Sequence, residues 1–344
     1  MTLTAYLPCK AIGTTPVSVT ALGFGAAGIG NLYRKVEDAD AEAALDAAFR
    51  HGITYVDTAP HYGQGLSERR VGAALNPGII LSTKVGRVLD PLHATPPPGT
   101  ERHGFVDGDP FEPRFDYSYD GIMRSFEASC TRLNRNYVDI LLCHDLGTMP
   151  HGDNADHHTR IFLNSGYRAM DELKAARNVG AIGLGVNETS ICLDVLPDTD
   201  LDTILLAGRY TLLEQGALDD LLPQCLRRKV SIILGGPFNS GILVGDNHYN
   251  YAAAPEAMVT KAKALGRVCA DHGVALAAAA LQFPLAHPAV ACVIPGMVSS
   301  GQVENNLELL YTDIPADLWN ALKDQGLLRE DAPVPQDTKQ PVAS

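Results

Sequence analysis

The stretch GITYVDTAPHYGQGLSERRVGAAL, residues 52–75, contains one complete strand–loop–helix unit and sets the interpretation of the whole chain. Its first part, ITYV, is short, apolar and β-branched, as expected of a strand buried on both faces. A polar turn follows, and residues 67–75 have the pattern of a helix that packs one face against a sheet. This unit is the building block of parallel α/β folds.

The same unit repeats along nearly the whole chain. Runs rich in Val, Ile and Leu predict strands, and longer amphipathic segments between them predict helices. The expected strands lie at 21–25, 54–57, 79–83, 138–143, 182–186, 203–206, 230–234 and 290–294, and the helices at 39–51, 67–75, 121–133, 160–179, 216–228 and 257–272. Eight parallel strands favour a (β/α)8 TIM barrel over an open doubly wound sheet. We expect one α/β barrel domain over residues 1–344.

Two insertions break the repeat, at residues 88–117 and 146–159, and both follow predicted strands. Loops that follow the strands of such a barrel form its catalytic face, so both insertions should border the site. The second contains His151, His157 and His158, whose spacing matches no strong metal motif. We predict a solvated polar loop there and no metal.

Glycines at positions 23, 25 and 28 form a GxGxxG pattern, which is also found in dinucleotide-binding folds. No acidic residue ends a clear following strand, where a ribose would need one. The pattern therefore indicates a loop that passes close to a ligand more than it indicates a Rossmann fold.

The composition limits the class of partner. The net charge is −13 without a block of like charge, which disfavours nucleic acid and anionic lipid and leaves a small molecule. Seven scattered cysteines predict reduced thiols in a cytosol, and the start MTLTAYLPCK lacks the pattern of a signal peptide. The apolar stretch 274–296 is interrupted by prolines and polar residues, so it does not predict a membrane span. We expect a soluble cytoplasmic protein, and the oligomeric state stays open.

Four polar residues follow three consecutive strands: Asp57, Tyr62 in the adjoining loop, Lys84 and His144. A barrel brings the carboxyl ends of its strands together at one face. A tyrosine hydroxyl has an ordinary pKa of about 10, and a nearby lysine ammonium favours its phenolate. Tyr62 can then exchange a proton with a substrate while Asp57 holds Lys84 and His144 hydrogen-bonds the reacting oxygen.

Each of the four residues also has a structural interpretation. Asp57 could cap a helix, Tyr62 could line a rim, and Lys84 and His144 could be a strand-end charge and a buried histidine. A different chemistry is also open, in which Lys84 forms a Schiff base in a barrel aldolase or hydrolase. Hydride transfer would require a nicotinamide, because no side chain supplies a hydride.

The segments GFGAAGIGNLY, LSTKVG and VDILLCHD, together with residues 52–75, resemble the aldo-keto reductase superfamily, and the resemblance covers essentially the whole chain. It implies a (β/α)8 barrel, a nicotinamide cofactor, and Asp57, Tyr62, Lys84 and His144 as the catalytic residues. It further implies a cofactor site made of Gly25, Ala26, Asp57, Asn187, Tyr210, Gly235, Gly236, Pro237, Phe238, Asn239, Ser240, Gly241, Gly296, Met297, Val298, Ser299, Gln302, Asn305 and Asn306.

Three positions depart from the superfamily pattern. Gly235 stands where an aromatic ring usually covers the nicotinamide, so we expect Tyr210 to cover it instead. Ala207 replaces a glutamine that binds the carboxamide. Gln302 stands where an arginine is frequent, and no Lys or Arg lies nearby to hold the extra phosphate of NADP. We predict NAD as the preferred cofactor, with use of NADP also allowed.

Within the superfamily the chain most resembles bacterial L-fucose and D-threo-aldose 1-dehydrogenases, with pyridoxal 4-dehydrogenase close to them. This implies oxidation of the anomeric carbon of an aldose to the lactone, with hydride transfer to NAD. Oxidation of pyridoxal, a more general aldehyde or ketone reductase, and a cofactor-binding regulatory module are the alternatives. By position, Tyr33, Arg34 and His61 should lie near the substrate, with the 88–117 insertion.

Overall fold

The computed structural model describes residues 7–335 and contains a sheet of eight parallel strands. In spatial order they are β16 (Val290–Ile294), β13 (Ser231–Gly235), β12 (Thr203–Ala207), β11 (Val179–Val186), β10 (Val138–His144), β5 (Ile80–Val85), β4 (Tyr55–Asp57) and β3 (Phe24–Gly25). Backbone hydrogen bonds from Gly23 to Val293 and from Gly25 to Pro295 join the first and last strands. The predicted (β/α)8 barrel is confirmed, and every predicted strand contributes to it.

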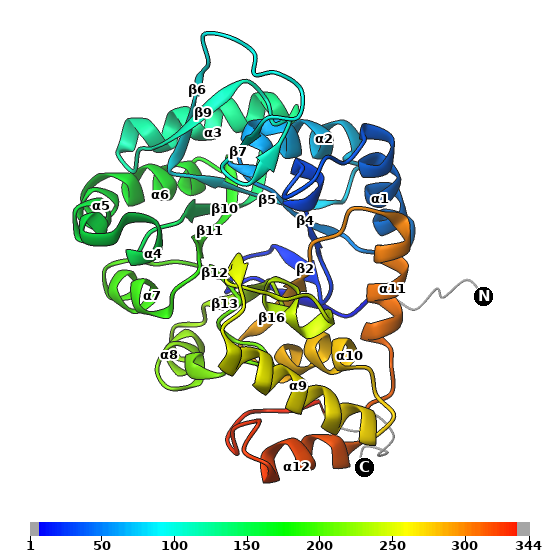
Figure 1. The fold of residues 1–344 in the computed structure, drawn as a ribbon. Helices are drawn as coiled ribbons and strands as arrows, with labels where there is room; N and C mark the ends of the chain where they lie inside the picture. The colour runs from blue at the N-terminus through cyan, green and yellow to red at the C-terminus, as the bar shows by residue number, and fades with distance from the viewer. Residues whose placement is uncertain (1–6, 336–344) are drawn as a thin grey trace.

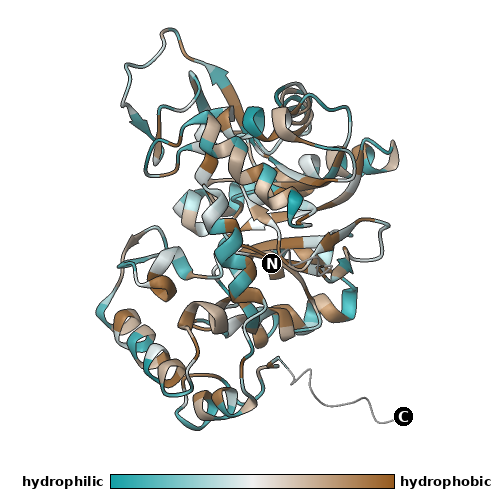
Figure 2. Cartoon of the chain, turned by 90° about the vertical axis from the view of Figure 1, so that its right-hand side faces the viewer, coloured by the Kyte–Doolittle hydropathy of each residue, from teal (hydrophilic) through white to brown (hydrophobic). Residues whose placement is uncertain are grey.

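Helices surround this barrel, as Figure 1 shows. They are α1 (Asp38–Arg50), α2 (Leu66–Ala74), α3 (Tyr119–Leu133), α6 (Tyr167–Ala175), α7 (Thr189–Val195), α8 (Leu221–Arg228), α9 (Glu256–Asp271), α10 (Leu276–Gln282), α11 (Ser300–Leu310) and α12 (Ala316–Asp324). Hydrophobic residues gather on the central strands, whereas the helices carry hydrophilic residues as well (Figure 2). The apolar helix faces bury the large outer core between helices and strands.

A short hairpin closes the amino-terminal end of the barrel. It consists of β1 (Cys9–Ala11) and β2 (Ser18–Thr20), and its turn is held by a hydrogen bond of 2.8 Å from the Gly13 amide to the Ser231 hydroxyl. Its side chains Val17 and Val19 join the apolar cluster inside the barrel. Only the carboxyl end of the barrel is therefore left for a ligand.

The glycines of the GxGxxG pattern allow close packing between the first strand and the last. A Cβ at Gly23 would lie 2.6 Å from the Tyr55 ring, and one at Gly25 would lie 2.9 Å from the Pro295 carbonyl oxygen. Both distances are shorter than side chains tolerate, so the closure of the barrel at this seam requires glycine. The pattern thus marks a barrel seam here, not a Rossmann turn.

The first insertion forms small antiparallel strands, and the second is helical. The first contains β6 (Arg87–Pro91), β7 (Glu101–Arg102), β8 (Phe105–Val106) and β9 (Phe111–Phe115), and its tip projects at the top of Figure 1. The second contains α4 (Thr148–His151) and α5 (Ala155–Ile161), so the prediction of a loop was wrong, although residues 148–160 are exposed or half-exposed. The ring of His151 packs 4.4 Å from that of Phe115, which explains why this segment is ordered against the protein.

Two further features bear on the predictions about metals and membranes. Within residues 7–335, no three His, Cys, Asp or Glu side chains are grouped as a metal site would require. In the same range no single helix could cross a bilayer; only the pair 256–271 and 276–286, bent by 102°, has the length and composition. The prediction about a signal peptide concerns residues 1–10, of which 1–6 lie outside the described residues.

Candidate active site

A cavity of about 430 Å³ opens at the carboxyl end of the barrel. Its floor comes from strand ends, including Gly185, Val186, Leu205 and Ala207. The first insertion supplies part of its wall through His103, Gly104 and Phe105, and the second supplies Met149 and Pro150. Both insertions therefore border the cavity. They lie at the carboxyl end of the barrel, where Tyr62, Lys84 and His144 also line the cavity.

Lys84 connects three of the four predicted catalytic residues. Its Nζ donates to Asp57 Oδ2 at 2.7 Å, to the Thr58 carbonyl at 2.8 Å and to the Tyr62 phenol oxygen at 3.1 Å. Lys84 and Asp57 are 1% and 2% exposed, and Asp57 also accepts a hydrogen bond from Ser82. Because all three ammonium hydrogens are used, Lys84 acts as a buried cation that faces the phenol.

The loop that carries Tyr62 depends on a close backbone approach. Tyr62 begins the short helix η2 (Tyr62–Gly65), which follows the end of β4. A Cβ at Gly30 would lie 2.8 Å from the Tyr62 carbonyl carbon, and Gly63 adopts a left-handed φ of 64°. Glycine at these two positions lets the loop turn sharply and brings the phenol over Lys84.

The pKa of Tyr62 differs from the sequence-based expectation. Burial raises the pKa of Tyr62 well above its ordinary value, and the carboxylates of Asp57 and Asp145 raise it further, whereas Arg87 lowers it. Lys84 was expected to lower this pKa, but its charge is neutralised by Asp57, so desolvation dominates. Tyr62 in the protein by itself is a protonated phenol.

His144 completes the group from the end of β10. Its ring centroid lies 6.0 Å from that of Tyr62, in an edge-to-face arrangement. Burial, with the nearby charges of Lys84 and Arg87, lowers the pKa of His144 well below its usual value, so the imidazole is neutral. Its Nδ1 has no hydrogen-bond partner among the residues that the structure describes. A neutral imidazole can donate one hydrogen bond to a reacting oxygen.

Asp145 and Arg87 form an ion pair that sequence reasoning missed. Arg87 Nη2 donates to Asp145 Oδ2 at 2.5 Å, and its guanidinium lies 4.4 Å from the centre of the Phe115 ring. The same carboxylate oxygen lies 3.4 Å from His144 Nε2. Arg87 directly follows the quoted segment LSTKVG, and Asp145 is the last residue of the quoted segment VDILLCHD. Both residues lie within two positions of the end of a barrel strand, and that position was the available signal.

The three predicted substrate residues behave differently. Tyr33 and His61 line the cavity, and the His61 ring lies 5.3 Å from that of Phe105. Burial and the charge of Arg87 lower the pKa of His61 to about 2, so this ring is neutral as well. Arg34 is exposed and does not line the cavity, so its prediction was wrong; the cation at the cavity is Arg87.

The predicted cofactor residues lie around the same end of the barrel. Asn187 follows β11 and lines the cavity, whereas Gly25 ends β3 and Ala26 follows it. Gly235 ends β13, and the next residues of the segment follow that strand: Gly236, Pro237, Phe238, Asn239, Ser240 and Gly241. The other group leads into α11 and begins it: Gly296, Met297, Val298, Ser299, Gln302, Asn305 and Asn306. Two observations fit an extended cofactor along these segments. A Cβ at Gly296 would meet no atom within 4 Å, so the space beside this residue is open. Asn239 Oδ1 is buried and has no hydrogen-bond partner within residues 7–335, so it can accept a hydrogen bond from a ligand. The side chain of Met297 is fully buried, which leaves only its backbone for a ligand.

Gln302 has a structural role at the start of α11. Its Oε1 accepts a hydrogen bond of 2.8 Å from the Val298 amide, while the Ser299 hydroxyl caps the helix. The amide group is therefore used to shape the loop. No Lys or Arg occurs between residues 295 and 310.

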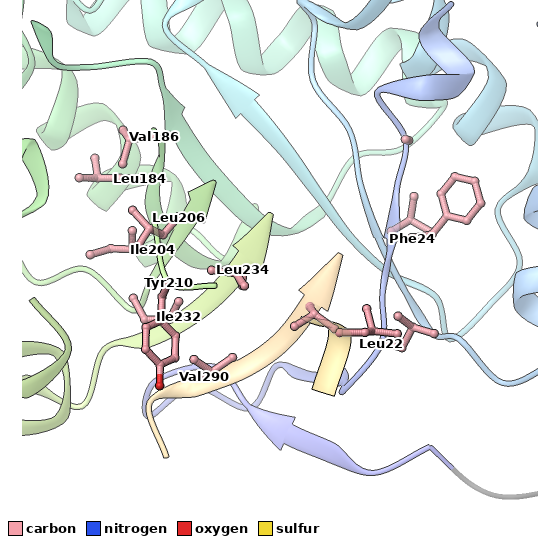
Figure 3. Packing of buried hydrophobic residues seen from close by; sticks show 14 of the residues in the cluster. Leu22, Phe24, Leu184, Val186, Ile204, Leu206, Tyr210, Ile232, Leu234 and Val290 are labelled. Carbon is pink, nitrogen blue, oxygen red and sulfur yellow. The ribbon is translucent and has the colours of Figure 1, made fainter. Parts of the chain in front are cut away.

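Tyr210 does not reach the cavity, so its predicted role as the cover of the nicotinamide was wrong. Its ring is fully buried and packs 5.2 Å from that of Phe283. Figure 3 shows it within the apolar cluster that includes Ile232 and Val290. The aromatic residue that does line the cavity on the side of Asn187 is Tyr251, which sequence reasoning missed.

The model of the aldo/keto reductase family matches residues 21–325. The chain belongs to this family. As an aldo/keto reductase it is an NAD(P)-linked oxidoreductase, and the resemblance stated from the motifs is confirmed.

Several relatives match over nearly their full length. Pyridoxal 4-dehydrogenase from Microbacterium luteolum is 40% identical over 93% of this chain and 97% of that protein. D-threo-aldose 1-dehydrogenase from a Pseudomonas species is 37% identical over 91% of this chain and 95% of that protein. Among solved structures, the holo form of an aldo-keto reductase from Bacillus halodurans matches with a TM-score of 0.72 and 24% identity, covering 97% of this chain and 100% of that one. At that identity the structural match supports the fold alone.

Proposed function

We propose that this aldo/keto reductase oxidises a cyclic hemiacetal to a lactone, with an aldose as the substrate and NAD as the hydride acceptor. The observation that carries the proposal is the contact of 3.1 Å between Lys84 Nζ and the phenol oxygen of Tyr62, at a cavity of substrate size. The similarity to a D-threo-aldose 1-dehydrogenase supports a sugar substrate.

In the proposed reaction the anomeric hydroxyl binds between Tyr62 and His144. The hydroxyl proton passes to the Tyr62 oxygen, while Lys84 stabilises the phenolate form that accepts it. His144, neutral and buried, donates a hydrogen bond to the same substrate oxygen. As the C–H bond at the anomeric carbon breaks, its electron pair leaves as hydride and a carbonyl forms. The bound nicotinamide supplies the hydride acceptor.

The preference for NAD rests on the loop that leads into α11. Recognition of the extra phosphate of NADP normally uses Lys or Arg, and residues 295–310 contain neither. Gln302, the candidate at the expected position, is occupied by its hydrogen bond to Val298. The seven cysteines, which are all free, agree with a reducing compartment such as the cytoplasm.

A second candidate substrate is pyridoxal, whose aldehyde and neighbouring hydroxymethyl group also form a cyclic hemiacetal. The cavity wall favours a flat ring, since Phe105, His61 and Tyr33 line it together. A pyridoxal 4-dehydrogenase is 40% identical to this chain. The same proton and hydride transfers apply to both substrates.

The test is a screen of L-fucose, other aldoses and pyridoxal, each with NAD and with NADP. We expect a steady rise in NADH absorbance with at least one aldose, and a kcat/KM for NAD at least tenfold above that for NADP. Turnover of pyridoxal alone would select the second candidate. Cofactor binding without turnover of any compound would contradict an enzyme and favour a regulatory module. Trapping of a substrate on Lys84 by borohydride would instead support Schiff-base chemistry.

A further inference from the structure

Asp145 is a charged residue at the cavity that the proposed reaction does not use. It directly follows His144, lines the cavity and is 8% exposed. Its backbone has a positive φ of 53°, a conformation that Asp and Asn adopt more readily than other residues but that is uncommon for both. An unusual backbone conformation beside a cavity suggests a functional requirement.

Hydrogen bonds from β11 and from both insertions hold the backbone of Asp145. Its amide donates to the Gly185 carbonyl at 2.9 Å. Its carbonyl accepts from the Tyr117 hydroxyl at 2.8 Å and from His151 Nε2 at 2.9 Å. Tyr117 ends the first insertion, and His151 ends α4 in the second. The protein itself therefore fixes the position of the carboxylate.

The two carboxylate oxygens of Asp145 have different surroundings. Oδ2 accepts a hydrogen bond of 2.5 Å from Arg87 Nη2, and it lies 3.4 Å from His144 Nε2. Among residues 7–335, Oδ1 accepts a single long hydrogen bond of 3.4 Å, from Asn187 Nδ2. A carboxylate oxygen can accept two hydrogen bonds, so Oδ1 can accept another from a ligand.

The contact with His144 places this carboxylate beside the reacting oxygen of the substrate. A carboxylate only accepts hydrogen bonds, so the proton of the neutral His144 ring is favoured on Nε2. In the proposed reaction this N–H donates to the anomeric oxygen. A group of the substrate that lies next to that oxygen must therefore face Asp145.

An aldose carries two oxygens next to its anomeric hydroxyl. One is the ring oxygen, which has no hydrogen and can only accept. The other is the hydroxyl on carbon 2, which can donate. A carboxylate beside the ring oxygen would bring two acceptors together, so the chemistry of Asp145 selects the hydroxyl on carbon 2.

We propose that Asp145 recognises the hydroxyl on carbon 2 of the aldose by accepting a hydrogen bond from it at Oδ1. Arg87 is a positioning residue in this subsite. Its guanidinium lies over the Phe115 ring and holds Oδ2, which leaves Oδ1 for the substrate. The subsite selects aldoses over their 2-deoxy analogues. This inference rests on the proposed oxidation of an aldose.

The test compares the kcat/KM of the best aldose of the screen with that of its 2-deoxy analogue, for example L-fucose and 2-deoxy-L-fucose. The deciding quantity is the ratio of the two values. A general loss of activity changes both values alike, and so does a change in the pKa of Tyr62, which Asp145 raises. For the unmodified enzyme we expect a ratio of at least about 100, because the analogue leaves a buried polar group unpaired.

In Asp145→Asn this ratio should fall at least about tenfold. Asparagine tolerates the positive φ. Arg87 can only donate, so the new amide oxygen must face it, and the NH2 group takes the place of Oδ1. The hydroxyl on carbon 2 then loses its charged acceptor, and the difference between a charged and a neutral partner corresponds to about tenfold.

A double variant tests the same loss if Asp145→Asn does not fold. Arg87→Met together with Asp145→Gly removes both charges, so no buried charge is left unpaired. Glycine also adopts the positive φ without strain. The ratio should fall at least as far as in Asp145→Asn.

Asp109→Asn is the matched control. Asp109 pairs with Arg69 at 2.6 Å in the first insertion and does not line the cavity. Its side chain is 13% exposed, close to the 11% of Asp145. The ratio for this variant should equal that of the unmodified enzyme.

Three results would count against the proposals, in different ways. An unchanged ratio in Asp145→Asn, or a ratio near one in the unmodified enzyme, would overturn the role of Asp145 and leave aldose oxidation intact. A Kd of NADH that weakens at least about tenfold in Asp145→Asn, with an unchanged ratio, would assign the carboxylate to the cofactor and also overturn the subsite. Failure of the unmodified enzyme to oxidise any aldose would overturn the proposed function itself.

Discussion

Replacement of Lys84 by methionine should separate the structural effect of the buried ion pair from its chemical effect. Methionine has a similar length but no charge, so Asp57 would remain as a carboxylate that is 2% exposed, with the Ser82 hydroxyl as its remaining side-chain donor. Loss of one partner from a buried pair costs about 3 to 5 kcal/mol. We expect the free energy of unfolding of Lys84→Met to fall by that amount.

The assay is urea unfolding followed by the fluorescence of Trp319, the single tryptophan, which is 1% exposed. In the double variant Asp57→Asn with Lys84→Met, no charge is left unpaired, so more than half of the lost stability should return. Turnover should stay at least about 100-fold below the unmodified enzyme in both variants, because the proton-transfer group has lost its cation.

Arg50→Met is the control for this experiment. Arg50 pairs with Asp46 at 2.8 Å on helix α1, and the two side chains are 62% and 61% exposed, so neither charge is buried. Its loss should cost about 1 kcal/mol or less and leave turnover unchanged. Two results would refute the reasoning: an unchanged unfolding free energy for Lys84→Met, or turnover that returns together with stability in the double variant.

Further predictions concern the loop of Tyr62 and the dependence on pH. In Gly30→Ala, the new Cβ would lie 2.8 Å from the Tyr62 backbone, about 0.6 Å closer than the 3.4 Å at which ordinary contact begins. The loop of Tyr62 must therefore move. Because a displacement of about 1 Å in an active site can lower the rate about 100-fold, kcat/KM should fall tenfold or more. Gly216→Ala, where a Cβ meets nothing within 4 Å, is the control, and equal kcat/KM in both variants would contradict this. Burial raises the pKa of Tyr62, and oxidation needs the phenolate, so the oxidation rate should rise from pH 7 to pH 10. The reduction rate should stay constant over this range. An oxidation rate that falls as the pH rises would contradict the role of the Tyr62 phenolate. Burial lowers the pKa of His287 to about 4, whereas its pKa in the unfolded chain is about 6.5. Between these two pH values the unfolded chain binds a proton that the folded protein does not. The unfolding temperature should therefore drop as the pH falls from 6.5 to 4. His287→Leu should lessen that drop, and a decline as steep as in the unmodified protein would count against it.

The barrel and the group around Tyr62 were predictable because both follow from the order of strands. Each strand is buried on both faces and reads as a continuous apolar run, and the residue after each run must lie at the carboxyl end. Asp57, Lys84 and His144 occupy such positions, so their convergence follows from strand pairing. The glycines of the GxGxxG pattern could be assigned to a barrel seam only from the contacts of Gly23 and Gly25.

The misses share a physical cause, which is that side chains on irregular segments are placed by long-range contacts. Tyr251 is 64 residues from Asn187 in the chain, and its position is set by the hydrogen bond of its own amide to Ser240 and by that of the neighbouring Asn250 with Arg209. Tyr210 is also an aromatic residue on an irregular segment, the one that follows β12, but its ring packs against that of Phe283 outside the barrel. Periodicity does not distinguish these two tyrosines. The raised pKa of Tyr62 was missed for a related reason, because desolvation depends on the packed environment and not on neighbouring charges alone.

The most direct measurement is the turnover of Tyr62→Phe with the best aldose and NAD, together with the Kd of NADH for the same variant. Phenylalanine removes only the phenol oxygen that lies 3.1 Å from Lys84 Nζ. We predict a fall in kcat of at least about 100-fold with the Kd of NADH within about threefold of the unmodified enzyme. A variant that oxidises the sugar within a few-fold of the unmodified rate would contradict the assignment of Tyr62 as the proton acceptor.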